Sequence, residues 1–183
     1  MRNPPYDSRS VANLMLDEAD RVGIRITNLA LQKLLYFAHG LFLIETKRPL
    51  VSGYFEAWQY GPVHSAAYKA FRSAGSERIE FRAKAQDLVT GKLTEIAEPD
   101  DPTVRRHIIH VLSSYGRLSP GRLVDVSHAK GSPWHFIVDK ARTSVAFGLR
   151  IPDNVIAERF KYHKVCVGET PIAGEPREDT PFT

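Results

Sequence analysis

One segment, LALQKLLYFAHGLFLI at residues 29–44, is apolar on almost every side when it is drawn as a helix. At about 3.6 residues per turn, one wide apolar face is formed by Leu31, Leu34, Leu35, Ala38 and Leu41 or Phe42. Phe37 and Ile44 lie on a further side. A helix that is apolar nearly all round is buried, so we expect this segment to be the centre of the fold.

A polar stripe runs along the same helix. Gln32, Tyr36 and His39 are spaced by four and three residues and therefore share one side. The stripe has two interpretations, which the residues alone leave open. Either its polar groups are satisfied inside the protein and fix neighbouring loops, or the stripe is the floor of a partly open groove walled by FEAWQYGPV, residues 55–63.

The apolar run is too short to cross a membrane. It has 16 residues, interrupted by Gln32, Lys33 and His39, whereas a span needs about 20 apolar residues. The N-terminal residues contain no apolar signal core. The single cysteine, Cys166, excludes an internal disulfide and a four-cysteine metal site. We therefore expect a cytoplasmic protein without a membrane partner.

The chain has 183 residues, which suits one domain with its own core. Helix caps and apolar spacing predict a mainly α fold, compact and built around the central helix. Residues 47–63 are expected to be extended or looped, and residues 79–98 a short β-hairpin around Thr90 and Gly91. The globular domain is predicted to cover residues 1–163. Residues 164–183, rich in Pro, Gly and acids, are predicted to be a flexible tail.

The helix boundaries follow from capping residues. We expect a first helix from Ser8 or Ser10 to Gly23, a second from Thr27 or Asn28 to about Glu45, and a third over residues 63–74 with Pro62 in its first turn. A fourth helix should follow a cap at Asp100 or Asp101, a fifth should cover residues 120–127 after Ser119, and the last should start at Asp153. A further short helix is expected after the turn SHAKGSPW, residues 127–134.

The residues show no constellation for catalysis or metal binding. His107 and His110 share a helix face but lack further ligands, so they are interpreted as surface histidines. His128 and Trp134 flank a Gly-Ser-Pro turn, where a structural anchor is favoured over a binding role. Cys166 has no base held beside it, and there is no glycine-rich phosphate loop. We expect no enzyme activity, no metal and no cofactor.

A DNA-binding interpretation is the main competitor. Residues 105–126 read as helix, turn and helix, and the arginines available for phosphates are Arg105, Arg106, Arg117 and Arg122. However, Leu123 and Val126 fall one position late for the tightest form of that motif. The net charge of +4 comes from scattered basic residues, so a nucleic-acid partner is only weakly supported.

Three motifs carry a family resemblance. TNLALQKLLYFAHGLFL (residues 27–43), PLVSGYFEAWQYGPVHSAAYKAF (residues 49–71) and SHAKGSPW together resemble the Panacea family, a phage-associated domain found as the antitoxin of many toxin–antitoxin pairs. The likeness covers roughly residues 10–160. The positions that match the family's motifs are Leu31, Gln32, Lys33, Leu34, Tyr36, Ala38, Glu56, Trp58, Tyr60, Gly61, Pro62 and Val63.

The resemblance implies an antitoxin that neutralises a separately encoded protein toxin by direct binding, without catalytic residues. The candidates for the toxin-binding groove are Gln32, Tyr36, His39, Glu56, Trp58, Tyr60, His64, His128 and Trp134. A variant of this hypothesis adds a protease or chaperone as a partner, to which the tail from Lys164 helps to deliver the toxin. The alternative is a DNA-binding or transcriptional regulatory module of a phage or mobile element, using the four arginines.

Overall fold

The protein is seen in a computed structural model that describes residues 3–143 and 149–163. The helices are α1 (Ser8–Arg21), α2 (Asn28–Thr46), α3 (Ser65–Phe71), α4 (Pro102–Tyr115), α5 (Pro120–Ser127), α6 (Pro133–Thr143) and α7 (Asp153–Arg159), with short 3-10 helices η1 (Arg72–Ala74) and η2 (Phe160–Tyr162). The strands are β1 (Phe55–Trp58), β2 (Gly61–Val63), β3 (Lys84–Gln86), β4 (Leu93–Glu95) and β5 (Arg150–Ile151). The mainly α fold is as expected.

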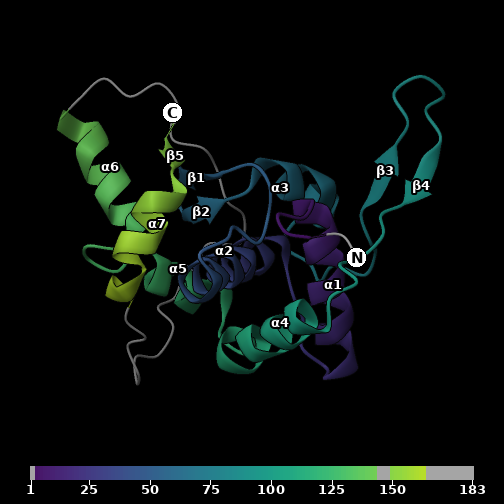
Figure 1. The fold of residues 1–183 in the computed structure, drawn as a ribbon, viewed down its shortest axis with the longest axis horizontal. Helices are drawn as coiled ribbons and strands as arrows, with labels where there is room; N and C mark the ends of the chain where they lie inside the picture. Colours follow the sequence, from purple (N-terminus) through teal and green to yellow (C-terminus); the bar gives the residue numbers. More distant parts are fainter. Residues whose placement is uncertain (1–2, 144–148, 164–183) are drawn as a thin grey trace.

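Helix α2 lies at the centre of the molecule (Figure 1). It is contacted by α1, α3, α4, α5, α7 and β2. Its side chains from Asn28 to Gly40 are all buried, which confirms the prediction of a core helix. The helix begins where Thr27 accepts a hydrogen bond from a first-turn amide, as expected, and ends at Lys47 in the left-handed conformation.

The other caps agree with the sequence except for α1. Asp101 and Ser119 cap α4 and α5 through their side-chain oxygens. Helix α1 is capped by Asp7, so the prediction of Ser8 or Ser10 was wrong. The physical reason is that both serines are buried, and Ser10 donates its hydroxyl to a distant loop carbonyl at 2.7 Å instead.

The segment after α2 forms a small sheet. β1 pairs antiparallel with both β2 and β5, with Glu56 opposite Val63 on one side and opposite Arg150 on the other. Pro62 therefore lies in β2, and α3 begins only at Ser65. The expected placement of Pro62 in a helix was wrong, because Gly61, at φ +108°, turns the chain back into a strand pair.

The hairpin predicted within residues 79–98 is confirmed: β3 and β4 pair, and they project away from the helices (Figure 1). The pairs Lys84–Glu95, Ala85–Thr94 and Gln86–Leu93 set its register. At its base the chain returns to α1 and α4 through buried Ala83 and Pro99.

Helix α4 places His107 differently from the prediction of two surface histidines. His107 is only 8% exposed, and its Nε2 lies 2.8 Å from the carbonyl of Ala38 on α2. The prediction was wrong for this residue because His107 shares the helix face of the buried Val104, Ile108 and Val111. His110 is exposed.

Two expectations concern parts of the chain that are not described. The predicted tail, residues 164–183, and Cys166 within it lie outside the described residues. Among the residues that are described, no helix is both long enough and apolar enough to span a bilayer.

Candidate functional site

Gln32, at the start of the polar stripe on α2, is fully buried. Its amide nitrogen donates to Asn28 Oδ1 at 3.1 Å, and its Oε1 accepts from the backbone amide of His64 at 3.1 Å. The second bond fastens the chain directly after β2 to the central helix. Gln32 is therefore satisfied on both sides of its amide.

Tyr36 is 0% exposed and surrounded by aromatic rings. Its hydroxyl lies 3.4 Å from Nε2 of His163, and its ring meets Phe55 edge-on with centroids 5.4 Å apart. His163 Nδ1 lies 2.8 Å from the carbonyl of Phe160, which assigns the proton to Nδ1 and leaves Nε2 to accept from Tyr36. Burial lowers the pKa of His163 to about 4 and raises that of Tyr36.

His39 ends the stripe and is 1% exposed. Its Nε2 lies 2.9 Å from Asp153 Oδ1 on α7, and its Nδ1 accepts from the backbone amide of Val51 at 3.4 Å. The three stripe residues are therefore closed inside the protein. Of the two interpretations, the structure agrees with the internally satisfied stripe, because Gln32, Tyr36 and His39 are each at most 1% exposed.

The two loop contacts of the stripe lie on either side of one strand pair. His39 holds Val51 before β1, and Gln32 holds His64 after β2. Lys33, also buried, donates from Nζ to the carbonyl of Pro62 at 3.2 Å. The central helix thus fixes the position of β1 and β2 through side chains of one segment.

The opposite side of this sheet is exposed at two of its residues, Tyr54 and Arg150, half-buried at Glu56 and buried at Trp58. Cross-strand partners and alternate residues along a strand share a face, which groups four side chains that we call the outer sheet face: Tyr54, Glu56, Trp58 and Arg150. The guanidinium carbon of Arg150 lies 3.9 Å from the ring centroid of Tyr54, which is 40% exposed. The outer sheet face combines an exposed aromatic ring with a cation.

Glu56 is held in the middle of the outer sheet face. Its Oε2 accepts from Trp58 Nε1 at 2.8 Å and its Oε1 accepts from Ser65 Oγ at 2.6 Å. The Trp58 ring meets Tyr68 edge-on at 4.8 Å and is 9% exposed. Hydrogen bonds and ring packing therefore hold Glu56 and Trp58 in place.

Trp134 and His128 border this sheet. The indole Nε1 of Trp134 donates to the carbonyl of Trp58 at 2.7 Å, and its ring stacks on His128 at a centroid distance of 3.6 Å. Burial, followed by the charges of Lys33 and His135, lowers the pKa of His128 to about 3. Trp134 anchors the loop before α6 to β1, as the sequence predicts.

The remaining groove candidates differ in accessibility. His64 is 5% exposed, and its Nε2 lies 2.8 Å from the carbonyl of Ser52; burial lowers its pKa. Tyr60 is half-buried at the β1–β2 turn. His64 therefore belongs to the fold, whereas Tyr60 is partly accessible.

The four candidate DNA-binding arginines differ in their ion pairs and in their exposure. Arg105 pairs with Glu18, which is nearly buried, and with Glu98 at 3.1 Å. Arg122 lies 3.6 Å from Asp125 and is 13% exposed. Arg106 and Arg117 are exposed. A phosphate would have to compete with carboxylates for the first two arginines.

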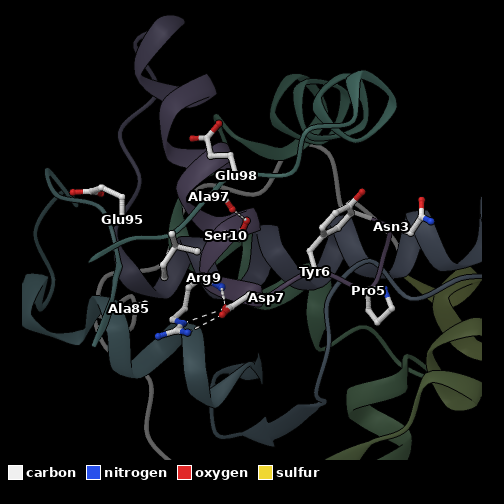
Figure 2. A pocket seen from close by; sticks show the side chains of 11 residues that line it. Asn3, Pro5, Tyr6, Asp7, Arg9, Ser10, Ala85, Glu95, Ala97 and Glu98 are labelled. Carbon is white, nitrogen blue, oxygen red and sulfur yellow. Dashed lines mark hydrogen bonds and ion pairs between the residues drawn. The ribbon is translucent and has the colours of Figure 1, made fainter. Parts of the chain in front are cut away.

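A cavity of about 650 Å³, which the sequence did not indicate, lies between the residues before α1 and the chain that follows β4 (Figure 2). The ion pair of Asp7 and Arg9, with atoms 2.7 Å apart, forms one wall, and Glu95 and Glu98 lie across from it. In the described part of the chain, no three or more His, Cys, Asp or Glu side chains are grouped to hold a metal ion.

These features describe a small, mainly helical protein whose central helix carries a polar stripe bonded inside the fold. The model of the antitoxin SocA-like, Panacea domain family matches residues 31–135, and the chain belongs to this family. Antitoxin SocA of Caulobacter vibrioides (strain NA1000 / CB15N) is 47% identical over 175 residues, which cover 96% of this chain and 93% of that protein. No solved structure matches the chain. The family resemblance is confirmed, and family and relative together support antitoxin function.

Proposed function

We propose that this chain neutralises a separately encoded protein toxin by binding it directly over the outer sheet face. The observation that carries the proposal is the pair of Tyr54 and Arg150, exposed and stacked at 3.9 Å on a sheet that the central helix holds rigidly. Membership of an antitoxin family supplies the class of partner.

The residue types of this face suit protein recognition. Tyr, Trp and Arg are the residues that most often dominate binding energies, because they bury a large area at a small entropic cost. Glu56 adds a charged acceptor whose orientation is fixed by Trp58 and Ser65. A face that is ordered before binding loses little further entropy in the complex.

The buried stripe acts indirectly in this proposal. Gln32 and His39 are positioning residues, since they fasten the chain at His64 and Val51 on either side of β1 and β2. Tyr36 holds the C-terminal 3-10 helix against the core through His163. Changes at these positions should therefore act through the placement of the outer sheet face.

Binding measurements test the proposal. The protein encoded by the gene next to that of this chain is purified and titrated with wild type, with Tyr54→Ala and with Tyr162→Ala. Tyr162 is a matched control, because it is also 40% exposed and has a cation, Lys161, over its ring. Tyr54→Ala should raise Kd by about thirtyfold, a loss of about 2 kcal/mol.

The control should leave Kd within about twofold of wild type. An unchanged Kd for Tyr54→Ala beside tight wild-type binding would reject the outer sheet face as the contact surface. Absence of any wild-type complex would reject direct binding.

Delivery of the bound toxin to a protease is a finer proposal. It rests on the predicted tail, residues 164–183, because chain termini are preferred sites for proteolysis to begin. The toxin's half-life in cells should lengthen when those residues are deleted, provided that the shortened chain still binds the toxin. An unchanged half-life would contradict the delivery role and leave neutralisation by binding intact.

A further inference from the structure

The tip of the β3–β4 hairpin carries the most exposed large apolar side chains of the described residues. Leu88 is 99% exposed and Val89 94%, and Leu93 on β4 is 60% exposed. Figure 1 shows the hairpin standing away from the helices, in agreement with the exposure of these side chains. Two neighbouring apolar side chains, Leu88 and Val89, are therefore in water at the end of a projecting element, which indicates a contact surface.

The turn at the tip is held in one conformation. Asp87 Oδ1 accepts from the amides of Val89 at 3.0 Å and Thr90 at 2.7 Å and from the Thr90 hydroxyl at 2.9 Å. Gly91, at φ +68°, closes the turn with a 2.8 Å bond from its amide to the Asp87 carbonyl. Leu88 and Val89 are therefore presented on a preorganised turn, which reduces the entropy lost on binding.

The base of the hairpin is fastened to α1 on both strands. Before β3, both backbone groups of Ala83 bond the side-chain amide of Asn13, at 2.8 and 3.0 Å, and Arg82 pairs with Asp17 and Asp20 at 2.6 Å. After β4, the carbonyl of Ala97 accepts from a serine hydroxyl of α1 at 2.7 Å. The hairpin is thus an arm with an anchored base and a bare apolar tip.

We propose that the β3–β4 hairpin is a docking arm, and that Leu88 and Val89 enter an apolar cleft on the toxin. This inference rests on the proposed function and adds a second contact surface to it. The arm lies apart from β5 and α6 (Figure 1), so the toxin is held at two places. Two linked contacts give a tighter complex than either contact alone.

Charge disfavours insertion of the tip into the cavity at the foot of the hairpin of a second copy of this chain. A convex apolar tip needs a concave apolar partner, whereas the cavity at the foot of the hairpin is lined by the charged Asp7, Arg9 and Glu98. Covering those charges with leucine would remove their solvation without replacing it. The family match over residues 31–135 includes the whole hairpin, which makes the arm part of the antitoxin domain.

The test is the double variant Leu88→Ser/Val89→Ser, titrated against the same neighbouring-gene product. Its thermal unfolding should match that of wild type, because both side chains are in water in the folded protein. Its Kd should rise by about tenfold or more, because the apolar contact is lost. Ile109→Ser is the matched control: Ile109 is 45% exposed on α4, and this variant should bind within about twofold of wild type.

The outcomes separate the two proposals. An unchanged Kd for the double variant, with tight wild-type binding, overturns the docking arm and leaves the proposed function standing. Failure of the wild type to bind or neutralise the toxin overturns both. If light scattering shows that the wild type is a dimer and the double variant a monomer, the tip contacts a second copy, and its assignment to the toxin is overturned.

Discussion

The ring of Phe160 lies directly on Gly40, so that a Cβ atom at residue 40 would overlap Cε2 of that ring. Gly40 is in the middle of α2 and Phe160 begins η2, the 3-10 helix that follows α7. The close approach lets the C-terminal part of the described chain pack against the central helix. It also brings His163 to within hydrogen-bonding distance of Tyr36.

Gly40→Ala should therefore destabilise the protein, although alanine alone favours a helix by about 1 kcal/mol. Overpacking costs about 1–3 kcal/mol against this gain of about 1 kcal/mol, so we expect a net loss of up to about 2 kcal/mol in the free energy of unfolding, measured in urea. In a Phe160→Ala background the ring is absent, so adding Gly40→Ala should lower the free energy of unfolding no further. Equal effects of Gly40→Ala in both backgrounds would show that the ring is not the cause.

Asn13 should be essential for the attachment of the hairpin arm. Asn13→Ala leaves the amide and carbonyl of Ala83 without their partner, and Ala83 is 4% exposed. We expect a loss of about 2 kcal/mol in the free energy of unfolding and faster hydrogen exchange at the Ala83 amide. Gln86→Ala on the exposed part of β3 serves as control, with an expected change below about 0.5 kcal/mol. Unaltered exchange at Ala83 in the Asn13 variant would contradict the anchored base.

The buried histidines should make the fold sensitive to acid. The pKa values of His163 and His128 are about 4 and about 3 in the folded protein, below their value of about 6.5 in the unfolded chain. Below pH 6.5 or so the unfolded chain therefore binds protons that the folded protein does not. Stability should be complete above that pH and should fall as the pH drops toward 4, by about 1.4 kcal/mol per pH unit for each histidine.

The variant His163→Gln isolates one of these contributions, because the amide keeps hydrogen-bonding atoms but does not titrate. Urea unfolding near pH 7 and near pH 5 should show a smaller difference for the variant than for wild type. The same difference in both proteins would show that His163 is protonated in the folded state or is not linked to stability.

The arginines distinguish a structural role from a DNA-binding role. Arg105→Ala should cost about 1–3 kcal/mol of stability, because the nearly buried Glu18 loses its closest partner and keeps only Arg21, at 3.5 Å. The exposed pair, changed together as Arg106→Ala/Arg117→Ala, should alter stability by less than about 0.5 kcal/mol. We expect no retardation of promoter DNA at low salt by the wild type. A salt-dependent complex that the double variant abolishes would favour the DNA-binding alternative.

The sequence predicts the elements whose signals are local. The central helix follows from an unbroken apolar segment, and the β3–β4 hairpin follows from alternation around Thr90 and Gly91. The burial of His107 could have been predicted as well, because this residue lies three positions after Val104 on the apolar stripe of α4. Its polar side chain obscured that signal.

The partners of the polar stripe were not visible in the sequence. His39 meets Asp153 across 114 residues, and Tyr36 meets His163 across 127. Likewise, β1 pairs with β5, more than ninety residues later. Such contacts depend on the tertiary arrangement of α2 and α7, so spacing alone could not decide between a satisfied stripe and an open groove.

The most direct test of the central claim is growth of cells in which the neighbouring gene is induced with and without this chain. Induction of that gene alone should arrest growth, and co-expression of the wild-type chain should restore it. The variant Tyr54→Ala/Arg150→Ala, at the same protein level, should restore growth less well. A neighbouring gene that is harmless alone, or an arrest that the wild-type chain does not relieve, would contradict the account.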